Sequence, residues 1–242
     1  MWYQPEVSLT SGAVLAVEAL LRWRHPDGSI WTASRFVDVA EDTGLILDIG
    51  TFVLQQACSH AADWVATHPG RATSVRVNLS ALQLGEAGLL ASLDDALASS
   101  GLDPALLCAE ITETALLRET ATVTANLAGI RERGIDIALD DFGTGYASLS
   151  YLRQYPVDVL KIDRTFIAHM TSRDHDRRLV AGIIALAGAL DITVTAEGVE
   201  YEAQATLLRA MGCPGAQGYL FAQAVPPDQV SGLLTTVYPH GM

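Results

Sequence analysis

Short apolar runs alternate along the chain with longer segments whose apolar residues recur at helical spacing. The eight short runs that are typical of β-strands span residues 2–9, 14–22, 74–79, 107–112, 135–139, 159–163, 192–197 and 216–221. The clearest helical segments span residues 47–68, 119–133, 175–190 and 201–211. Strands that alternate with helices form a parallel sheet, and eight of them in 242 residues predict an α/β fold of the TIM-like (β/α)8 barrel type.

The first two predicted strands depart from this pattern, because only Thr10-Ser11-Gly12-Ala13 separates them. Parallel strands need a crossover connection of about a dozen residues or more, whereas antiparallel strands need only a turn. We therefore expect a barrel with an antiparallel first strand, formed by residues 1–242 as a single domain. An open doubly wound sheet is the alternative fold for the same alternation of strands and helices.

Polar side chains follow nearly every apolar strand at its C-terminal end. They are Glu18, Asn78, Glu110, Glu113, Asp140, Asp141, Asp163, Glu197, Glu200 and Gln217. In a parallel barrel these strand ends meet on one face, where barrel enzymes carry their active sites. One acid at a strand end is commonly a helix cap or a solvated group, but its recurrence on several strands predicts a functional site.

A cluster of carboxylates on one face repels itself unless a bound cation or raised pKa values relieve the charge. Carboxylate and amide oxygens, without suitably spaced His or Cys, favour Mg²⁺ or Mn²⁺ over zinc. The adjacent Asp140 and Asp141 allow one carboxylate to bridge two ions while the other holds the second ion. Two such ions can activate a water and stabilise both oxygens of an in-line displacement at phosphorus.

Composition narrows the function further. The chain carries 15 Lys and Arg against 28 Asp and Glu, and its net charge of −13 disfavours binding to DNA. It has no apolar run of membrane-spanning length and no signal peptide, so we expect a cytoplasmic location, with a membrane anchor elsewhere in a parent protein left open. The only lysine, Lys161, lies in the aliphatic run at 157–163, where burial of its charge is costly unless a function uses it.

Together these residues resemble the EAL-domain family of cyclic di-GMP phosphodiesterases. The motifs that carry the resemblance occur in order: Tyr3-Gln4-Pro5, Glu18-Ala19-Leu20-Leu21-Arg22-Trp23, Asn78-Leu79-Ser80, Glu110-Ile111-Thr112-Glu113, Asp140-Asp141-Phe142-Gly143-Thr144-Gly145, Lys161-Ile162-Asp163, Glu197-Gly198-Val199-Glu200 and Gln217-Gly218-Tyr219. The family fold is a barrel with an antiparallel first strand. The resemblance implies metal-dependent hydrolysis of cyclic di-GMP to linear pGpG.

The resemblance also implies roles for individual residues. The metal ligands would be Glu18, Asn78, Glu110, Asp140, Asp141 and Glu197. The catalytic set would be Lys161, Glu18, Glu197 and Asp163, in which Lys161 orients the attacking water and Asp163 supports Lys161. The substrate contacts would be Gln4, Leu20, Arg22, Gln217 and Glu200. Glu113 would anchor the loop at residues 141–149. Whether Lys161 or the metal ions deprotonate the water stays open.

Cofactors and partners follow from the same resemblance. Two Mg²⁺ or Mn²⁺ ions would serve each active site, and Ca²⁺ would support binding while inhibiting catalysis. We expect a homodimer formed near residues 147–155, and a domain excised from a longer protein that carries sensor or cyclase domains. A catalytically inert cyclic di-GMP receptor is the main alternative, and a partner-binding scaffold is a third. Glu6 stands where the family often has a neutral or basic residue. We expect it to face solvent, with a modulating role at the rim of the site as the alternative.

Overall fold

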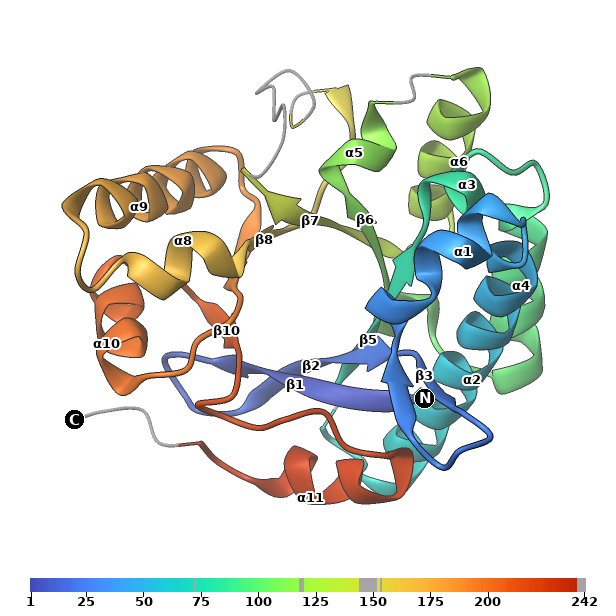
Figure 1. Ribbon diagram of the computed structural model, residues 1–242, viewed down its shortest axis with the longest axis horizontal. Coiled ribbons are helices and arrows are strands. Elements are labelled where there is room, and N and C mark those ends of the chain that lie inside the picture. Colours follow the sequence, from blue (N-terminus) through green and yellow to red (C-terminus); the bar gives the residue numbers. More distant parts are fainter. Residues whose placement is uncertain (72, 118–119, 144–151, 153, 239–242) are drawn as a thin grey trace.

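The centre of the protein is a closed barrel of eight strands (Figure 1). The computed structural model describes the whole chain except residues 72, 118–119, 144–151, 153 and 239–242. Around the barrel the strands follow in the order β1 (Trp2–Ser8), β10 (Gly215–Gln217), β9 (Thr193–Ala196), β8 (Val159–Ile162), β7 (Asp136–Phe142), β6 (Leu107–Thr112), β5 (Ser74–Leu79) and β2 (Val14–Leu20). β1 is antiparallel to β10 and β2, and every other neighbouring pair is parallel. The predicted barrel with an antiparallel first strand is confirmed.

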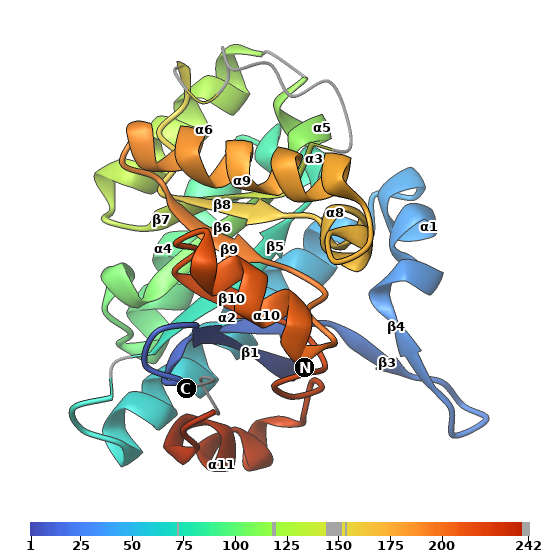
Figure 2. The ribbon, with the colours of Figure 1, turned by 90° about the vertical axis from the view of Figure 1, so that its left-hand side faces the viewer.

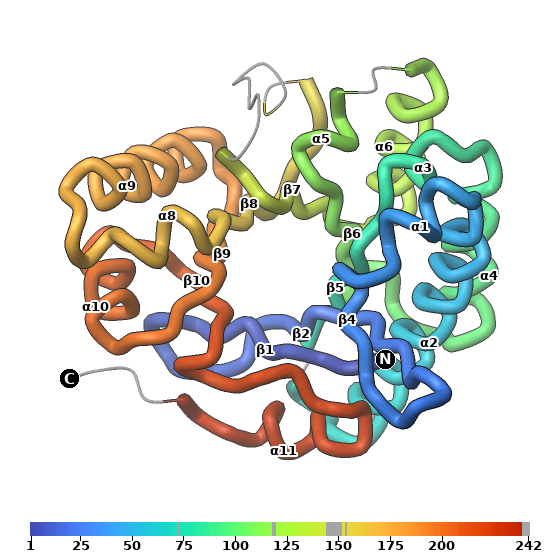
Figure 3. The backbone as a smooth tube through the Cα atoms, viewed as in Figure 1, coloured from blue at the N-terminus to red at the C-terminus, as the bar shows by residue number. Residues whose placement is uncertain are grey.

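Helices cover the outside of the barrel, as the path of the chain in Figure 3 shows. The longer helices are α2 (Ile46–Thr67), α4 (Leu89–Ser100), α6 (Ala121–Glu132), α9 (Asp174–Ala189) and α10 (Glu202–Ala210). The shorter helices are α1 (Val37–Asp42), α3 (Ala81–Leu84), α5 (Glu113–Leu116), α8 (Arg164–His169) and α11 (Val230–Thr235), with 3-10 turns at Ala33–Arg35, Pro104–Leu106 and Pro227–Gln229. In the part of the chain that is described, none of the helices combines the length and apolar character needed to cross a membrane.

A small hairpin outside the barrel was not predicted. It consists of β3 (Arg22–Arg24) and β4 (Ile30–Thr32), which pair with each other and project from the body of the molecule beside α1 (Figure 2). The predicted second strand at 14–22 therefore ends early, at Leu20, where the chain leaves the barrel. Three-residue strands at the surface carry too little apolar periodicity to be recognised from sequence.

The main hydrophobic core lies between the strands and the surrounding helices, and it includes residues from both. Successive side chains of a strand point to opposite faces, and β5 shows the consequence. Val75, Val77 and Leu79 belong to the outer core, whereas Arg76 and Asn78 face the barrel interior and contact acidic residues there. Apolar packing therefore surrounds the barrel, and much of its interior is polar.

Glu6 does not face solvent, so that expectation is wrong. Its side chain is completely buried inside the barrel, where it forms an ion pair with Arg76 and accepts a hydrogen bond from Thr195 Oγ1 at 3.1 Å. Glu6 is two residues from Gln4 in β1, so strand periodicity places both side chains on the inner face. The sequence gives no sign that Glu6 is buried in an ion pair, because its partner Arg76 lies on another strand, β5.

The last strand is shorter than the predicted run at 216–221, because it ends at Gln217. Gly218 follows with φ of 157°, and a Cβ there would lie 2.1 Å from the backbone oxygen of Val199. Only glycine fits this close approach, which turns the chain away from the barrel. The backbone NH of Val199 donates a hydrogen bond to the carbonyl of Gln217 at 3.0 Å, which holds the two segments together where they cross.

We expect Gly218→Ala to destabilise the protein by roughly 2–5 kcal/mol, because the methyl group meets backbone atoms and the φ value is strained for alanine. Gly232→Ala in α11 is the matched control, since a Cβ there has open space around it. Urea unfolding followed by circular dichroism measures both changes. Equal stability of the two variants would contradict the steric argument.

Candidate active site

The ammonium group of Lys161 lies at the centre of an acidic cluster inside the barrel. Lys161 Nζ is 2.6 Å from Glu197 Oε1, 2.8 Å from Glu110 Oε1, 3.5 Å from Glu18 Oε2 and 3.9 Å from Asp140 Oδ1. These acids come from β2, β6, β7 and the segment that follows β9, so the structure brings together residues far apart in the sequence. The side chain of Lys161 has no exposed surface. Four carboxylates therefore offset the cost of burying its charge.

Amide side chains hold Glu18 from two sides. Asn78 Nδ2 donates to Glu18 Oε1 at 2.8 Å, and Gln217 Nε2 donates to Glu18 Oε2 at 2.7 Å. Gln217 Nε2 also lies 3.3 Å from Gln4 Oε1, and Gln4 Nε2 donates to the carbonyl of Ala222 at 3.0 Å. This chain of hydrogen bonds links β1, β2, β5 and β10 and fixes the direction of the Glu18 carboxylate.

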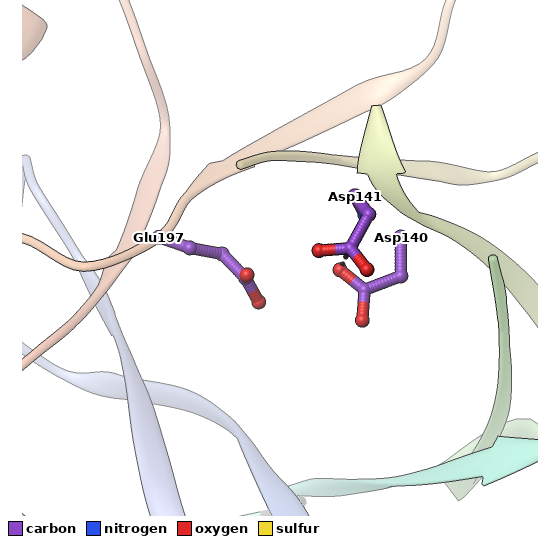
Figure 4. A group of neighbouring side chains, drawn as sticks. All are labelled: Asp140, Asp141 and Glu197. Carbon is purple, nitrogen blue, oxygen red and sulfur yellow. Dashed lines mark hydrogen bonds between the residues drawn. The ribbon is translucent and has the colours of Figure 1, made fainter. Parts of the chain in front are cut away.

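Asp140 and Asp141 break the regular alternation of β7. The pairing with β8 shifts register between Leu139 and Phe142, and Asp141 has a positive φ of 55°. The backbone NH of Asp141 donates to Asp140 Oδ1 at 2.8 Å. In a regular strand these neighbours would point to opposite faces, but the irregularity lets both carboxylates turn toward the interior. Each of Asp140, Asp141 and Glu197 offers an oxygen, and these oxygens lie within 4.8 Å of one another (Figure 4).

Burial and mutual repulsion raise the pKa of most of these acids. Burial, reinforced by neighbouring acids, raises the pKa of Glu197 to about 8 and that of Asp141 to about 6. The pKa of Glu110 is raised well above its ordinary value, chiefly by burial. Burial also opposes ionisation of Glu18, but Lys161 and the amides of Gln217 and Asn78 outweigh it and lower its pKa. The cluster thus holds more carboxyl groups than Lys161 alone can keep ionised.

The pKa of Lys161 moves the other way from a usual buried lysine. Burial lowers it, but the carboxylates of Asp140, Glu110, Glu18 and Glu197 outweigh burial and raise the pKa well above its ordinary value. Lys161 is therefore fully charged while these acids are its partners. A cation that draws the acids away would leave the ammonium group free to contact another ligand.

The donor set of this cluster fits divalent cations. It consists of carboxylate and amide oxygens, which Mg²⁺ and Mn²⁺ prefer. Glu110 Oε2 is buried and has no hydrogen-bond partner among the described residues. A buried carboxylate oxygen without a partner is costly, and a cation beside it would remove that cost. Glu18, Asn78 and Glu110 lie near Lys161, while Asp140, Asp141 and Glu197 form the compact oxygen group, so the structure gathers the predicted ligands in one place.

Two further predicted residues lie at the edge of the cluster. Asp163 is buried, and its Oδ1 accepts from the backbone NH of Thr165 at 2.9 Å at the start of α8. A side-chain hydrogen bond to Asp163 contributes to the raised pKa of Asp141, after burial and the charge of Asp140. Glu113 is also buried, and its Oε2 accepts from the backbone NH of Gly143 at 3.3 Å. That contact holds the start of the loop at 141–149, whose residues 144–149, including Thr144 and Gly145, lie outside the described part.

An open cleft lies beside the acidic cluster. It is lined by Gln4, Glu18, Glu197, Glu200, Gln217 and, not anticipated from sequence, Arg164 and Tyr219. Arg164 directly follows the Lys161-Ile162-Asp163 motif, and Tyr219 ends the Gln217-Gly218-Tyr219 motif. Their position next to predicted site residues was the one sign in the sequence that they lie near the site. Leu20 ends β2 half-buried. Arg22 Nη1 donates to the carbonyl of Leu21 at 3.0 Å, and its guanidinium lies 5.8 Å from the Trp2 ring centre.

Comparisons with known proteins show relatives of similar sequence and fold. The bifunctional diguanylate cyclase/cyclic di-GMP phosphodiesterase MucR of Pseudomonas aeruginosa is 42% identical over 229 residues, which cover 94% of this chain and 33% of MucR. The structure of the PaMucR phosphodiesterase in a c-di-GMP complex superposes with a TM-score of 0.90 at 41% identity, over 95% of this chain and 92% of that one. The EAL domain of Mycobacterium smegmatis DcpA gives a TM-score of 0.82 at 34% identity, over 98% and 96% of the two chains.

The chain spans only part of the curated relatives that it matches, with values between 27% and 37% of their length. The family model of the EAL domain matches residues 1–224, which include every strand of the barrel and all the acids around Lys161. The chain therefore belongs to the EAL domain family.

Proposed function

We propose that this chain hydrolyses one phosphodiester bond of cyclic di-GMP and releases linear pGpG, with two divalent cations at the acidic cluster. The observation that carries this proposal is the position of Lys161 Nζ within 4 Å of Glu18, Glu110, Asp140 and Glu197, beside the oxygen group that Asp141 completes. The similarity to the PaMucR phosphodiesterase, solved with c-di-GMP, supports the choice of substrate. A domain that only binds the nucleotide would not need the full set of acids.

Six residues would hold the cations: Glu18, Asn78, Glu110, Asp140, Asp141 and Glu197. Asp140 would bridge both ions, and Asp141 would hold the second, because their carboxylates already turn to the same side of β7. Asn78 would present its amide oxygen in place of the amide nitrogen that now donates to Glu18. When bound, Mg²⁺ or Mn²⁺ supplies an activated water and offsets charge on the phosphate oxygens, whereas the looser coordination of Ca²⁺ positions water poorly.

Lys161 would orient the attacking water through its ammonium group. Its present carboxylate partners are the same side chains that would hold the cations, so cation binding frees its hydrogen atoms for the water. Loss of those partners and the arrival of like charge would lower the pKa of Lys161 and so raise the fraction of neutral amine that can accept a proton from the water. Asp163 would support this position through its contact with Asp141 and the start of α8.

The nucleotide would lie in the cleft that Gln4, Glu200 and Gln217 line. Leu20 and Arg22 would be further contacts, although neither side chain is among the residues that line this cleft. The planar guanidinium of Arg22 is suited to a phosphate, because it can donate two parallel hydrogen bonds. Glu113 would anchor the loop at 141–149 through Gly143. A chain of net charge −13 can accept a dianionic ligand at this place because cations reverse the local sign.

The cellular setting is also a proposal. We propose a cytoplasmic domain that works as a homodimer and is regulated by sensor or cyclase domains of a longer protein. MucR supports the last point, because it is bifunctional and about three times longer than its match to this chain. The segment expected at the dimer interface, 147–155, lies largely outside the described residues.

We expect Glu18→Ala to fold normally and to lower turnover of cyclic di-GMP by at least about 10²-fold, because it removes a ligand shared by the cation site and Lys161. Glu202→Ala is the control, since Glu202 is exposed on α10 and pairs with Arg209. Chromatography of pGpG with Mg²⁺, Mn²⁺ and Ca²⁺ in parallel measures the effect. Binding of cyclic di-GMP without release of pGpG by the unaltered protein would favour the inert receptor.

We expect Lys161→Met to lower kcat by about 10²–10⁴-fold with little change in KM, because methionine fills the space but cannot orient or deprotonate water. Since Lys161 is fully buried and in mid-strand, removing it also leaves the acids uncompensated, which costs roughly 3–5 kcal/mol in cation-free protein. Steady-state kinetics and thermal unfolding with and without Mg²⁺ separate the two effects. Unchanged kcat would rule out the role given to Lys161.

We expect Mg²⁺ to raise the melting temperature more at about pH 8 than at about pH 5.5. Folding raises the pKa of Glu197 to about 8 and of Asp141 to about 6, so the cation-free fold binds protons more tightly than the unfolded chain. That fold therefore loses stability as pH rises from the ordinary carboxyl range toward 8, where ionised acids repel and where cations bind best. A melting-temperature increase that is the same at both pH values would show that Mg²⁺ binds elsewhere.

A further inference from the structure

A second layer of charged residues lies deeper in the barrel than the acids around Lys161. Arg76 precedes Asn78 by two residues in β5, and Thr195 precedes Glu197 by two residues. The side chains of Arg76 and Thr195 therefore point to the same inner face as Asn78 and Glu197, but deeper in the barrel. Glu6 of β1 lies at the same depth and forms an ion pair with Arg76. Both side chains are nearly or completely buried, with exposed fractions of 0% for Glu6 and 7% for Arg76.

The partners of Glu6 and Arg76 fix their positions. Thr195 Oγ1 donates to Glu6 Oε2 at 3.1 Å, and Arg76 Nη1 contacts Cys108 Sγ at 3.2 Å. Burial lowers the pKa of Arg76, but the carboxylate of Glu6 and its other neighbours outweigh burial and keep the guanidinium charged. Arg76 therefore carries a permanent positive charge in the floor of the candidate active site.

Arg76 has a second carboxylate within reach. Its Nε lies 4.0 Å from Glu110 Oε1, and Glu110 has another oxygen, Oε2, without a hydrogen-bond partner among the described residues. Lys161 contacts Glu110 Oε1 at 2.8 Å, so a guanidinium released from Glu6 would be attracted to the second oxygen of Glu110, Oε2. Glu6 competes with Glu110 for Arg76, and the structure shows Arg76 with Glu6.

We propose that Glu6 is a positioning residue that retains Arg76 and thereby keeps the Glu110 carboxylate available for a divalent cation. This inference rests on the proposed function, because it assigns Glu110 to the cation site. Without the charge of Glu6, Arg76 turns to Glu110 and pairs with the carboxylate that the cation needs. The uncompensated positive charge also lies below the cation site and repels the ion. Glu6 thus acts through Arg76 and Glu110 and touches neither substrate nor cation.

Calorimetric titration with Mn²⁺, without substrate, tests this inference on the purified chain. Glu6→Gln keeps the size and one hydrogen-bonding oxygen of the side chain but removes the charge. We expect it to weaken Mn²⁺ binding by about tenfold or more, the size found when groups behind a metal ligand are lost. The double variant Glu6→Gln/Arg76→Met removes the cation as well, and we expect it to restore the affinity to within about threefold of the unaltered chain.

Each outcome has a distinct meaning. If the unaltered chain binds no Mn²⁺, the proposed function fails, whatever Glu6 does. If the unaltered chain binds Mn²⁺ and Glu6→Gln binds it equally well, or if the double variant stays as weak as the single one, the role of Glu6 is overturned. Should Glu6→Gln not fold, Thr195→Val removes only the hydroxyl that holds Glu6 Oε2, and we expect binding about threefold weaker. Unchanged affinity of Thr195→Val would then overturn the inference.

Discussion

The buried ammonium group of Lys161 and the carboxylates around it constrain the rest of this structure. A lone lysine in the interior of a strand would be strongly destabilising, and so would the acids without it. The lysine and the acids stabilise one another because β8 brings Lys161 into contact with four carboxylates from β2, β6, β7 and the end of β9. These are Glu18, Glu110, Asp140 and Glu197. The closed barrel is what holds these segments at contact distance. The acids still exceed the one positive charge among them, and this excess is the physical reason that the site fits divalent cations.

This charged interior depends on apolar packing elsewhere. The strands carry valine, leucine and isoleucine toward the helices and polar residues toward the barrel axis, so the stabilising core is a shell around the charged centre. The arrangement has at least two charged levels. The upper level is the acidic cluster with Lys161, and the lower level is the pair of Glu6 and Arg76. Because both levels lie in a low-dielectric interior, charge in the lower level acts on the upper one with little screening by solvent.

Local backbone irregularities complete the site. The register shift in β7 turns Asp140 and Asp141 to the same side. The positive φ of Asp141 marks the residue at which side chains stop alternating between the two faces of the strand. Gly218 allows the chain after β10 to cross closely over Val199, so that Gln217 stays at the barrel end beside Glu18. Both features lie within the site, where strained or unusual backbone is commonly found in proteins.

The amino-acid sequence alone was enough to predict the order of the eight barrel strands, the four helices α2, α6, α9 and α10, the antiparallel first strand and the gathering of acids at one end of the barrel. It did not reveal the hairpin of β3 and β4 or helix α4. The predicted features follow from period-two and helical spacing of apolar residues and from a connection too short for a crossover, which are local properties of the chain. Three features emerge only from the three-dimensional structure: which carboxylates share Lys161, the burial of Glu6 against Arg76, and the place of Arg164 and Tyr219 in the lining of the cleft. Those contacts join residues from different strands and loops, and the distance between such residues is set by barrel closure and backbone irregularities, which local patterns do not encode.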